Sequence, residues 1–566
     1  MPDAEALLAD LDDEQRAAVL ALHGPVCILA GAGTGKTRTI TRRIAYGVAT
    51  GVYRPDRVMA LTFTARAAGE LRTRLHELGA PVQSRTFHAT ALAQLNHFWP
   101  LVVGGGFPTV VTTKARLLGQ AAERLRIKAD TATLRDVAAE IEWRKVSRLS
   151  IEQYGTAVMT QRKVPGTLTA EQLIDLHRGY ESAKDEQRSI DFEDVLLAAA
   201  GMIESEPRVA NQVREQYRFF VVDEYQDVSP LQQELLDLWL GERNDLCVVG
   251  DASQTIYSFA GASSRFLLDF STRYRGAQSV RLEHNFRSAA PVLAAANALM
   301  RGQAGALSLV AAPDPARPES GAAPAVTVSG HSSDVSEAHE VARSVAQEIA
   351  AGRRPEQIAI LFRINAQVQL LESALDAAGV PSQVRGMQRF FELREVQDAM
   401  LLLRGAALSI TDEPLFKTVS DVLRGLGWSQ NPPDARGALR DRWESLNAIM
   451  ALAEEVPGQS LRGFVDELFR RKAGQHAPTM SAVTLASLHS AKGLEWESVH
   501  IVGLSEGLLP ISFAVTPEQI DEERRLLYVG VTRARRALSL SWAGNIQRSP
   551  RKPSRFLAEL TPTTAR

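Results

Sequence analysis

Short apolar runs recur along the chain, separated by segments of helix-like composition. The runs include VCILA, RVMALTF, FFVVDE, LCVVGD and QIAILFR, and the helix-like stretches include Ala65 to Leu78 and Leu231 to Leu240. Strands that alternate with helices in this way pair in parallel and need helices over both faces of the sheet. The order therefore predicts an α/β fold. Because 566 residues exceed what one hydrophobic core usually supports, we expect several domains.

Composition and charge exclude several classes of protein. Hydrophobic residues make up 45% of the chain and charged residues 23%, which is ordinary for a soluble globular protein. The formal net charge of -2 excludes a globally basic nucleic-acid coat and leaves room for a local basic groove. The acidic N-terminus does not resemble a secretory signal, and no charge-free apolar stretch approaches the roughly 18 residues of a membrane span. We therefore expect a cytoplasmic protein without a membrane partner.

Two regions interrupt the α/β pattern. Between Val103 and Ser189 the sequence becomes charged and helix-rich, as in KARLLGQAAERLRIK, and a second helical region runs from about Phe390 to Met480. The Pro/Ala-rich stretch from Ala311 to Ala325 is typical of a solvated loop. The single cysteines Cys27 and Cys247 lie inside apolar runs, which favours buried thiols over a metal site. A duplicated α/β core with two helical insertions fits this order.

The stretch CILAGAGTGKTRT, Cys27 to Thr39, predicts a phosphate-binding loop. Its glycines allow backbone N–H groups to turn inward around phosphates, the Lys36 ammonium adds a positive charge, and the Thr37 hydroxyl is a ligand for Mg²⁺. Ala30 stands where the usual pattern has its first glycine. The alternative is a glycine-rich turn with an incidental lysine. The apolar run before the loop and the helix-like segment after it favour a nucleoside triphosphate site.

Adjacent carboxylates end the apolar run FFVVDEYQD. Asp223 suits a ligand of the phosphate-bound Mg²⁺, and Glu224 suits the group that orients and deprotonates a water molecule for hydrolysis. The alternative is a solvated carboxylate pair that caps a helix, and we assign Asp227 to that alternative.

The motifs together resemble those of the UvrD/PcrA/Rep helicases of superfamily 1A. In that family's order, the chain contains LDDEQRAAV, the GTGKT loop, LTFTARAAGEL, RTFHA, VVDEYQD, VGDASQTIYSFAGA, LEHNFRS, LFRINAQ, SLHSAKGLEW and EERRLLYVGVTRA. The resemblance covers nearly the whole chain, and ASQTIYSFAGA is similar to an actinobacterial UvrD-like branch.

This resemblance implies two RecA-like P-loop NTPase cores, each a parallel sheet flanked by helices, with two helical insertions. We expect the first core at 1–110 and 190–283 with its insertion at 111–189. The second core, with the arginine fingers, is expected at 284–389 and 481–566, and its insertion at 390–480 is shorter than in long family members.

The resemblance also implies an ATP and Mg²⁺ site. Its catalytic group would be Lys36, Asp223, Glu224, the γ-phosphate sensor Gln254, and the arginine fingers Arg287 and Arg533. Guanidinium groups stabilise the charge on the transferring phosphoryl oxygens, an effect worth about 10³ to 10⁵ in rate. Thr37 and Asp223 would hold the metal. The remaining nucleotide contacts would come from Gln15, Ala30, Gly31, Ala32, Gly33, Thr34, Gly35, Arg38, Phe286 and Glu495.

Single-stranded DNA would be held by stacking and by polar contacts. Phe63, Tyr257 and Phe259 occupy the family's stacking positions, and stacking is worth roughly 1 to 3 kcal/mol per base. The polar contacts would come from His88, Arg363, Asn365 and His489. Taken one at a time, such aromatics are more often core residues and such histidines more often structural. Their places inside the motifs favour the DNA role.

We therefore expect an ATP- and Mg²⁺-dependent helicase that moves 3′ to 5′ on single-stranded DNA and opens tailed duplexes in repair or replication restart. Phe259 and Ala260 stand where the family usually has tryptophan and arginine, which weakens the expected coupling of ATP to DNA. An alternative is a DNA-dependent ATPase that displaces proteins without unwinding. A non-catalytic binding scaffold fits poorly with the intact catalytic positions. RNA stays open as a substrate, and protein partners and oligomeric state are not indicated.

Overall fold

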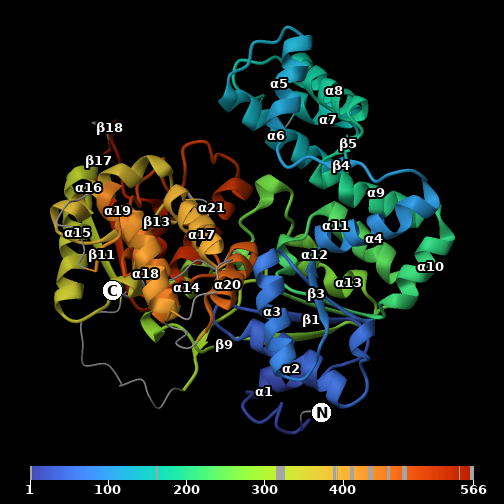
Figure 1. Cartoon of the computed structure of the whole chain (residues 1–566), viewed down its shortest axis with the longest axis horizontal. Helices are drawn as coiled ribbons and strands as arrows, with labels where there is room; N and C mark the ends of the chain where they lie inside the picture. Colours follow the sequence, from blue (N-terminus) through green and yellow to red (C-terminus); the bar gives the residue numbers. More distant parts are fainter. Residues whose placement is uncertain are drawn as a thin grey trace. The chain divides into compact units, whose positions relative to one another are not determined.

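The computed structural model describes residues 3–160, 164–313, 326–385, 391, 393–407, 413–430, 438–454, 459–474, 481–546 and 549–560. The chain divides into two compact units, coloured along the sequence in Figure 1. The first comprises 1–283 and 304–307, and the second comprises 284–303 and 308–566. Of the predicted Pro/Ala-rich loop, residues 314–325 lie outside the described part of the chain.

A six-stranded parallel sheet forms the centre of the first unit. Its order is β3-β2-β6-β7-β1-β8, with β1 Val26–Ala30, β2 Val58–Thr62, β3 Gln83–Thr86, β6 Phe219–Val222, β7 Leu246–Gly250 and β8 Gln278–Leu282. Successive side chains of the inner strands enter opposite cores: Cys27, Met59 and Phe220 enter one, and Ile28, Ala60 and Val221 the other. Burial on both faces explains why these strands are almost continuously apolar.

Helices cover both faces of this sheet. One core contains residues of α1 Asp13–Leu20, α2 Lys36–Ala49 and α3 Ala65–Glu77. The opposite core contains residues of α4 Phe87–Val102, α9 Phe192–Ser205, α10 Pro207–Gln216, α11 Pro230–Leu240, α12 Arg265–Leu268 and α13 Phe270–Arg273. The helix expected at Leu231 starts at Pro230 because Ser229 caps it in a capping box with Gln232.

Four further helices of the first unit form a small cluster, seen at the top of Figure 1. They are α5 Ala115–Arg124, α6 Thr131–Val146, α7 Ile151–Thr160 and α8 Ala170–Glu186, accompanied by the strand pair β4 Thr109–Val110 and β5 Ser189–Ile190. The cluster has its own apolar core, with Leu117, Val137 and Leu173 fully buried. Buried ion pairs from Lys145 to Asp191 at 2.8 Å and to Asp194 at 2.6 Å join it to the start of α9.

The second unit repeats the same architecture. Its parallel sheet has the order β11-β16-β15-β12-β14-β13, with β11 Val326–His331, β12 Ile358–Phe362, β13 Ser382–Arg385, β14 Val483–Ser487, β15 Trp496–Ile501 and β16 Ala534–Ala543. Short pairs are formed by β9 His284–Asn285 with β10 Val310–Ala311 and by β17 Asn545–Ile546 with β18 Ser549–Pro550. The expected α/β class, with parallel sheets flanked by helices, is confirmed.

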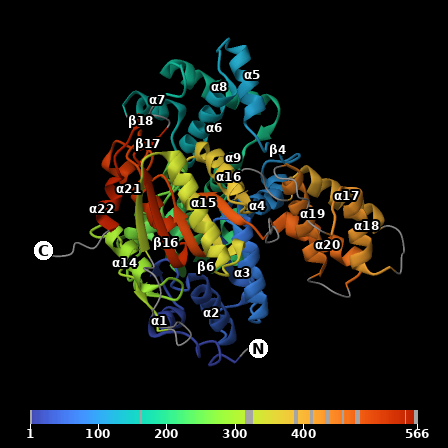
Figure 2. The same cartoon turned by 90° about the vertical axis from the view of Figure 1, so that its left-hand side faces the viewer.

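The helices of the second unit fall into two groups. Those at the sheet are α14 Ala290–Leu299, α15 Asp334–Ala350, α16 Val368–Ala377 and α21 Pro517–Val531, and α22 Arg555–Leu560 packs on α14. The others, α17 Arg394–Ala406, α18 Leu415–Gly425, α19 Ala438–Glu454 and α20 Leu461–Gly474, share a separate core and appear together in Figure 2. Parts of the expected second insertion lie outside the described residues, including 390, 392, 408–412 and 431–437.

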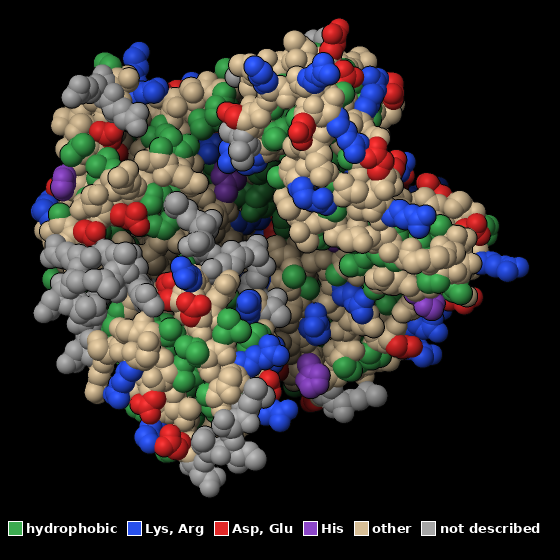
Figure 3. Space-filling view, turned by 45° about the horizontal axis from the view of Figure 1, so that its top comes forward, with side chains coloured by type: hydrophobic (Ala, Val, Ile, Leu, Met, Phe, Trp, Pro, Cys, Tyr) green, Lys and Arg blue, Asp and Glu red, His purple; other side chains and the backbone are tan. Residues whose placement is uncertain are grey.

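Surface charge and helix hydropathy agree with the composition. Lys and Arg side chains are interspersed with Asp and Glu on the face drawn in Figure 3. Among the described residues, no helix is both long enough and apolar enough to cross a membrane.

Candidate active site

The strand order of the first unit brings the predicted phosphate and Mg²⁺ motifs to one edge of the sheet. The loop 31–35 follows β1, the Asp223–Glu224 pair follows β6, and Gln254 follows β7. β7 lies between β1 and β6, and all three strands are parallel. Carboxyl ends of neighbouring parallel strands share an edge, where ligands of open α/β sheets bind. The three motifs therefore meet although they are far apart in sequence.

The phosphate loop has the backbone geometry that its glycines predict. Gly33 and Gly35 have φ of 70° and 81°, in the left-handed region that favours glycine. Gly35 is the N-cap of α2, so the loop ends directly at a helix N-terminus. Thr34 closes the turn through its hydroxyl, which donates to the Gly31 carbonyl at 2.9 Å. Backbone N–H groups and the helix dipole at such a position favour an anion.

Lys36 and Gln15 are the predicted contacts whose polar atoms most clearly favour a bound ligand. The Lys36 Nζ atom is buried, and no described residue accepts a hydrogen bond from it. Gln15 is fully buried, and its Nε2 donates to the Thr34 carbonyl at 3.0 Å. Its Oε1 has no hydrogen-bond partner among the described residues. Burying an ammonium or an amide oxygen without a hydrogen-bond partner costs free energy, and a bound ligand would provide the partners.

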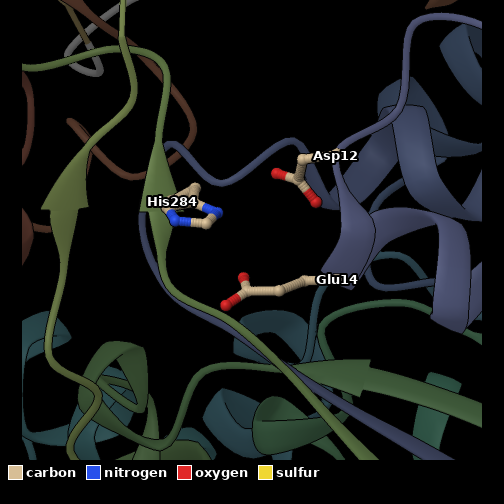
Figure 4. Close-up of side chains that lie close together, drawn as sticks. All are labelled: Asp12, Glu14 and His284. Carbon is tan, nitrogen blue, oxygen red and sulfur yellow. The ribbon is translucent and has the colours of Figure 1, made fainter.

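The helix that carries Gln15 is fixed at its start. Asp12 caps α1 by accepting a hydrogen bond from the Gln15 backbone N–H at 2.7 Å, and Glu14 accepts one from the Glu283 backbone N–H at 2.8 Å. Figure 4 draws these two carboxylates together with His284, the residue that follows Glu283. Because His284 belongs to the second unit, we assign no metal site to the three.

Two other predicted residues flank the loop. Thr37 is half-buried in the first turn of α2. The Arg38 guanidinium donates to the Asp10 carbonyl and forms an ion pair with the Asp10 carboxylate at 3.8 Å.

The predicted Mg²⁺ motif forms a tight, strained turn. The Asp223 backbone N–H donates to the Leu61 carbonyl at 2.9 Å, and Asp223 Oδ1 accepts from the Glu224 backbone N–H at 2.9 Å. Glu224 has φ 52° and ψ 42°, a left-handed conformation that costs a non-glycine residue about 1–3 kcal/mol. Such strain is typical of functional sites. Asp227 does not match its interpretation as a solvated carboxylate: its side chain is buried, because η2 Tyr225–Asp227 turns it inward.

Gln254 is held by its own loop. It is buried, and its Nε2 donates to Asp251 Oδ2 at 2.7 Å. Asp251 Oδ1 accepts from the Ser253 backbone N–H at 2.9 Å. The sequence did not indicate the role of Gln226, whose side chain connects this loop to Glu224.

The predicted stacking residues of the first unit form an aromatic group. The rings of Phe63 and Tyr257 are stacked, with centroids 5.5 Å apart and planes 12° apart, and Phe259 meets Tyr257 edge-on at 6.1 Å. Phe63 and Phe259 are 42% and 62% exposed, which leaves ring surface for a base. Burial, with Asp227 and Glu224 nearby, raises the pKa of Tyr257 to about 12. Its phenol is therefore neutral near pH 7.

His88 lies beside an aromatic residue that the sequence analysis missed. The His88 and Phe192 rings are in edge contact at 6.0 Å, and Phe192 is 44% exposed at the start of α9. Burial and the nearby Lys114 ammonium lower the pKa of His88 to about 4. Phe192 stands outside every recognised motif, so only its exposure in the fold reveals it.

In the second unit, three motifs are tied together around Arg287. Asn285 Oδ1 accepts from the Arg287 backbone N–H at 2.8 Å, and the Ser288 hydroxyl donates to the Ala534 carbonyl at 2.7 Å. The Arg287 Nε lies 2.5 Å from Glu495 Oε2, and Arg535 Nη2 lies 2.7 Å from Glu495 Oε1. Glu495 is thus shared by two arginines, one of which, Arg535, the sequence did not single out.

Phe286 and Arg533 accompany this group. Phe286 is 46% exposed, as an adenine-stacking ring requires. Arg533 is buried, and its guanidinium donates to the Val529 carbonyl at 2.9 Å, the Leu494 carbonyl at 3.1 Å and the Thr532 hydroxyl at 3.1 Å.

The predicted DNA contacts of the second unit follow adjacent strands. Arg363 follows β12 and His489 follows β14, which pair in parallel, and Asn365 is exposed at the start of η6 Asn365–Gln367. The Arg363 guanidinium is engaged by Glu523, with Nη2 at 2.7 Å from Oε1. Burial and the Arg363 charge lower the pKa of His489 to about 4. Both histidines are therefore neutral near pH 7.

Comparisons with known proteins identify relatives along the whole chain. A family model for the UvrD/REP helicase N-terminal domain matches residues 11–275, and one for the UvrD-like helicase C-terminal domain matches 280–431 and 438–545. "ATP-dependent DNA helicase UvrD2" of Mycobacterium tuberculosis is 47% identical over 99% of this chain and 83% of its own length. "DNA helicase II" of Escherichia coli is 29% identical over 99% and 88%, and "ATP-dependent DNA helicase PcrA" of Leuconostoc citreum is 27% identical over 99% and 86%.

Proposed function

The chain belongs to the UvrD/REP helicase family, and on that premise we propose that it is an ATP-dependent helicase that moves 3′ to 5′ on single-stranded DNA. Its substrates would be single strands and tailed duplexes met in DNA repair or replication restart, which would place it with the nucleoid in the cytoplasm. The observation that carries the ATP assignment is the buried Lys36 ammonium without an acceptor, at a glycine loop that opens α2.

The residues of the first unit divide the work of hydrolysis. The loop N–H groups and Lys36 would hold the phosphates, and Gln15 would present its free amide oxygen to the adenine amino group. Thr37 and Asp223 would hold Mg²⁺, which neutralises phosphate charge when bound. Glu224 would orient a water molecule and accept its proton, and Gln254 would donate to the γ-phosphate. The phosphate loop, the Asp223–Glu224 pair and Gln254 all follow strands at the same edge of the sheet.

The arginines of the second unit would complete the site. Arg287 and Arg533 would supply guanidinium charge to the transferring phosphoryl group, Phe286 would stack on adenine, and Glu495 would orient Arg287 through their ion pair. Arg287 is paired with the Glu495 carboxylate. If its guanidinium moves to a phosphate, it exchanges one anionic partner for another and stays paired.

Strand binding would rest on stacking more than on charge. Phe63 and Phe259 present exposed ring surface and Tyr257 stacks on Phe63, and neutral His88 and His489 donate or accept hydrogen bonds without adding positive charge. Asn365 is exposed and free to contact bases or sugars. Arg363 would contact the strand with the donors that Glu523 leaves available.

The second candidate function is a DNA-dependent ATPase that translocates and displaces proteins without separating strands. Ala260 favours it, because an alanine beside Phe259 offers the strand neither charge nor a hydrogen bond.

The test is strand separation of a duplex with either a 3′ or a 5′ single-stranded tail, in the presence of ATP and Mg²⁺. Unwinding from the 3′ tail alone is expected, and its loss together with DNA-stimulated hydrolysis is expected in Lys36→Ala and Glu224→Gln. Lys128→Ala, which changes an exposed lysine of the same unit, is the matched control. Full turnover by Lys36→Ala would refute the active site, whereas hydrolysis without unwinding would favour the protein-displacing ATPase.

A further inference from the structure

The second unit contains a cavity at the carboxyl edge of its sheet, with a volume of about 770 Å³. It lies between the first turns of α15 and α16, helices that pack side by side (Figure 2), and beside the segments that follow β12 and β15. Its walls are mainly apolar and include Val335, Leu370, Leu371, Val502 and Leu508. Sites for small molecules have this size, and they combine apolar walls with a few polar groups.

Glu337 is the most deeply buried polar side chain of this lining, and it is 4% exposed. Its Oε1 accepts from the Gly503 backbone N–H at 2.9 Å and from the Ser541 hydroxyl at 2.5 Å. Its Oε2 has no hydrogen-bond partner among the described residues. Burial raises the pKa of Glu337, because a carboxylate removed from water loses its solvation. A positively charged ligand group would supply the interaction that Oε2 lacks.

The polar part of the lining does not suit an anion. Asp334 and Glu337 are acidic, and no lysine, arginine or histidine is among the described residues that line the cavity. Two N–H groups at the start of α15 are also in use: that of Val335 donates to Asp334 Oδ1 at 3.0 Å, and that of Ser336 to the Ser333 hydroxyl at 3.2 Å. A phosphate group would therefore meet negative charge here, whereas a cation would be attracted.

We propose that this cavity binds an aliphatic amine, whose ammonium pairs with Glu337 Oε2 and whose methylene chain lies against the apolar walls. The proposal goes beyond the proposed function, because the cavity shares no residue with the predicted ATP site or the predicted DNA contacts.

The test is calorimetric titration of the full chain, without nucleotide or DNA, with three ligands of equal chain length: octylamine, octanol and octanoate. We expect saturable binding of one octylamine per chain. The affinity for octanol and octanoate should be at least about tenfold weaker, because a hydrogen bond to a charged group contributes about 1.5–3 kcal/mol.

Two variants separate the charge from the apolar walls. Glu337→Gln keeps an acceptor for Gly503 and Ser541 and removes the charge, so octylamine should bind at least about tenfold more weakly. Ala366→Phe places a ring on an exposed position of the lining, and should weaken octylamine and octanol alike. Thermal unfolding of each variant shows that it is folded, and Ala366→Phe decides the matter if Glu337→Gln does not fold.

Glu340→Gln is the matched control. Glu340 lies one turn further along α15, its side chain is 43% exposed and paired with Arg343, and it does not line the cavity. Its affinity for octylamine should equal that of the wild type. The proposal is overturned if octylamine shows no saturable binding, if octanol or octanoate binds as tightly, or if Glu337→Gln and Glu340→Gln bind octylamine equally well.

Discussion

The two histidines proposed to contact DNA are expected to bind as neutral rings, and this predicts how binding depends on salt and pH. An unperturbed histidine, with a pKa near 6.5, is about three-quarters protonated at pH 6. The lowered pKa of about 4 for His88 and His489 leaves about 1% protonated at the same pH. Lowering the pH from 8 to 6 should therefore add almost no positive charge to the strand-binding surface.

The magnitude can be expressed as a salt dependence. Each phosphate neutralised on a single strand contributes about -0.7 to the slope of log Kobs against log salt. Two unperturbed histidines would together gain about 1.5 charges at pH 6 and steepen the slope by about one. With both pKa values lowered by burial, we expect the slope to change by less than about 0.1 from this source.

The assay is binding of a fluorescent oligothymidylate at several salt concentrations, at pH 8 and at pH 6, without nucleotide. The control is the double variant His88→Gln, His489→Gln, which keeps hydrogen-bonding groups and removes both titrations. Any steepening common to both proteins comes from other groups. A slope that steepens by about one in the wild type and not in the variant would refute neutral binding.

Three further changes test individual features of the first unit. His177, whose buried ring nitrogens have no partner among the described residues, has its pKa lowered to about 3 by burial and by nearby cations. On acidification, His177 therefore binds a proton in the unfolded chain and not in the folded chain, which lowers the stability of the folded state. Between pH 8 and pH 5 this loss amounts to about 2 kcal/mol in the wild type and should be absent in His177→Phe. Hydrogen exchange in α7 and α8, measured at both pH values, reports the difference. Gly35→Ala should weaken ATP binding at least tenfold by titration, because its Cβ would lie 2.7 Å from Gln15 Nε2, whereas Gly24→Ala, with a similar φ of 72° and no neighbour within 4 Å, should not. Phe192→Ala should weaken binding of single-stranded DNA by about 1–3 kcal/mol in the same fluorescence assay, with no change in ATP affinity.

The strands that sequence patterning identified are those buried on both faces. VCILA, FFVVDE and LCVVGD correspond to β1, β6 and β7 in the interior of the first sheet. The patterning missed β3 and β8 of that sheet and β11 and β13 of the second, which are the edge strands. Edge strands need less apolar burial, and sequences such as QSRT and SQVR carry no hydrophobic run. The interior strand β14, VTLAS, was also missed because two of its five residues are polar.

The candidate site was predictable where a motif sets local geometry and not where distant segments meet. The glycine loop and the Asp223–Glu224 pair each consist of adjacent residues, so a local motif is enough to predict them. The ion pairs of Glu495 with Arg287 and Arg535, and the contact of His88 with Phe192, depend on tertiary packing that no periodicity encodes. Asp227 shows the converse: an acidic residue that composition places in solvent is buried by a single turn of 3-10 helix.

The strand order of the first unit brings the residues proposed for ATP chemistry and those proposed for DNA binding to one edge of the same sheet. Phe63 directly follows β2, Tyr257 lies in the loop after β7, the phosphate and Mg²⁺ motifs follow β1 and β6, and all four strands are parallel. The loop after β7 would therefore contribute to both proposed tasks, since Gln254 is proposed to bind the γ-phosphate and Tyr257, three residues later, to bind DNA. Phe259 and Ala260, the positions where the chain departs from the usual family pattern, lie in the same loop. The departure should therefore alter how much strand movement each hydrolysed ATP produces, and leave the affinity for ATP unchanged.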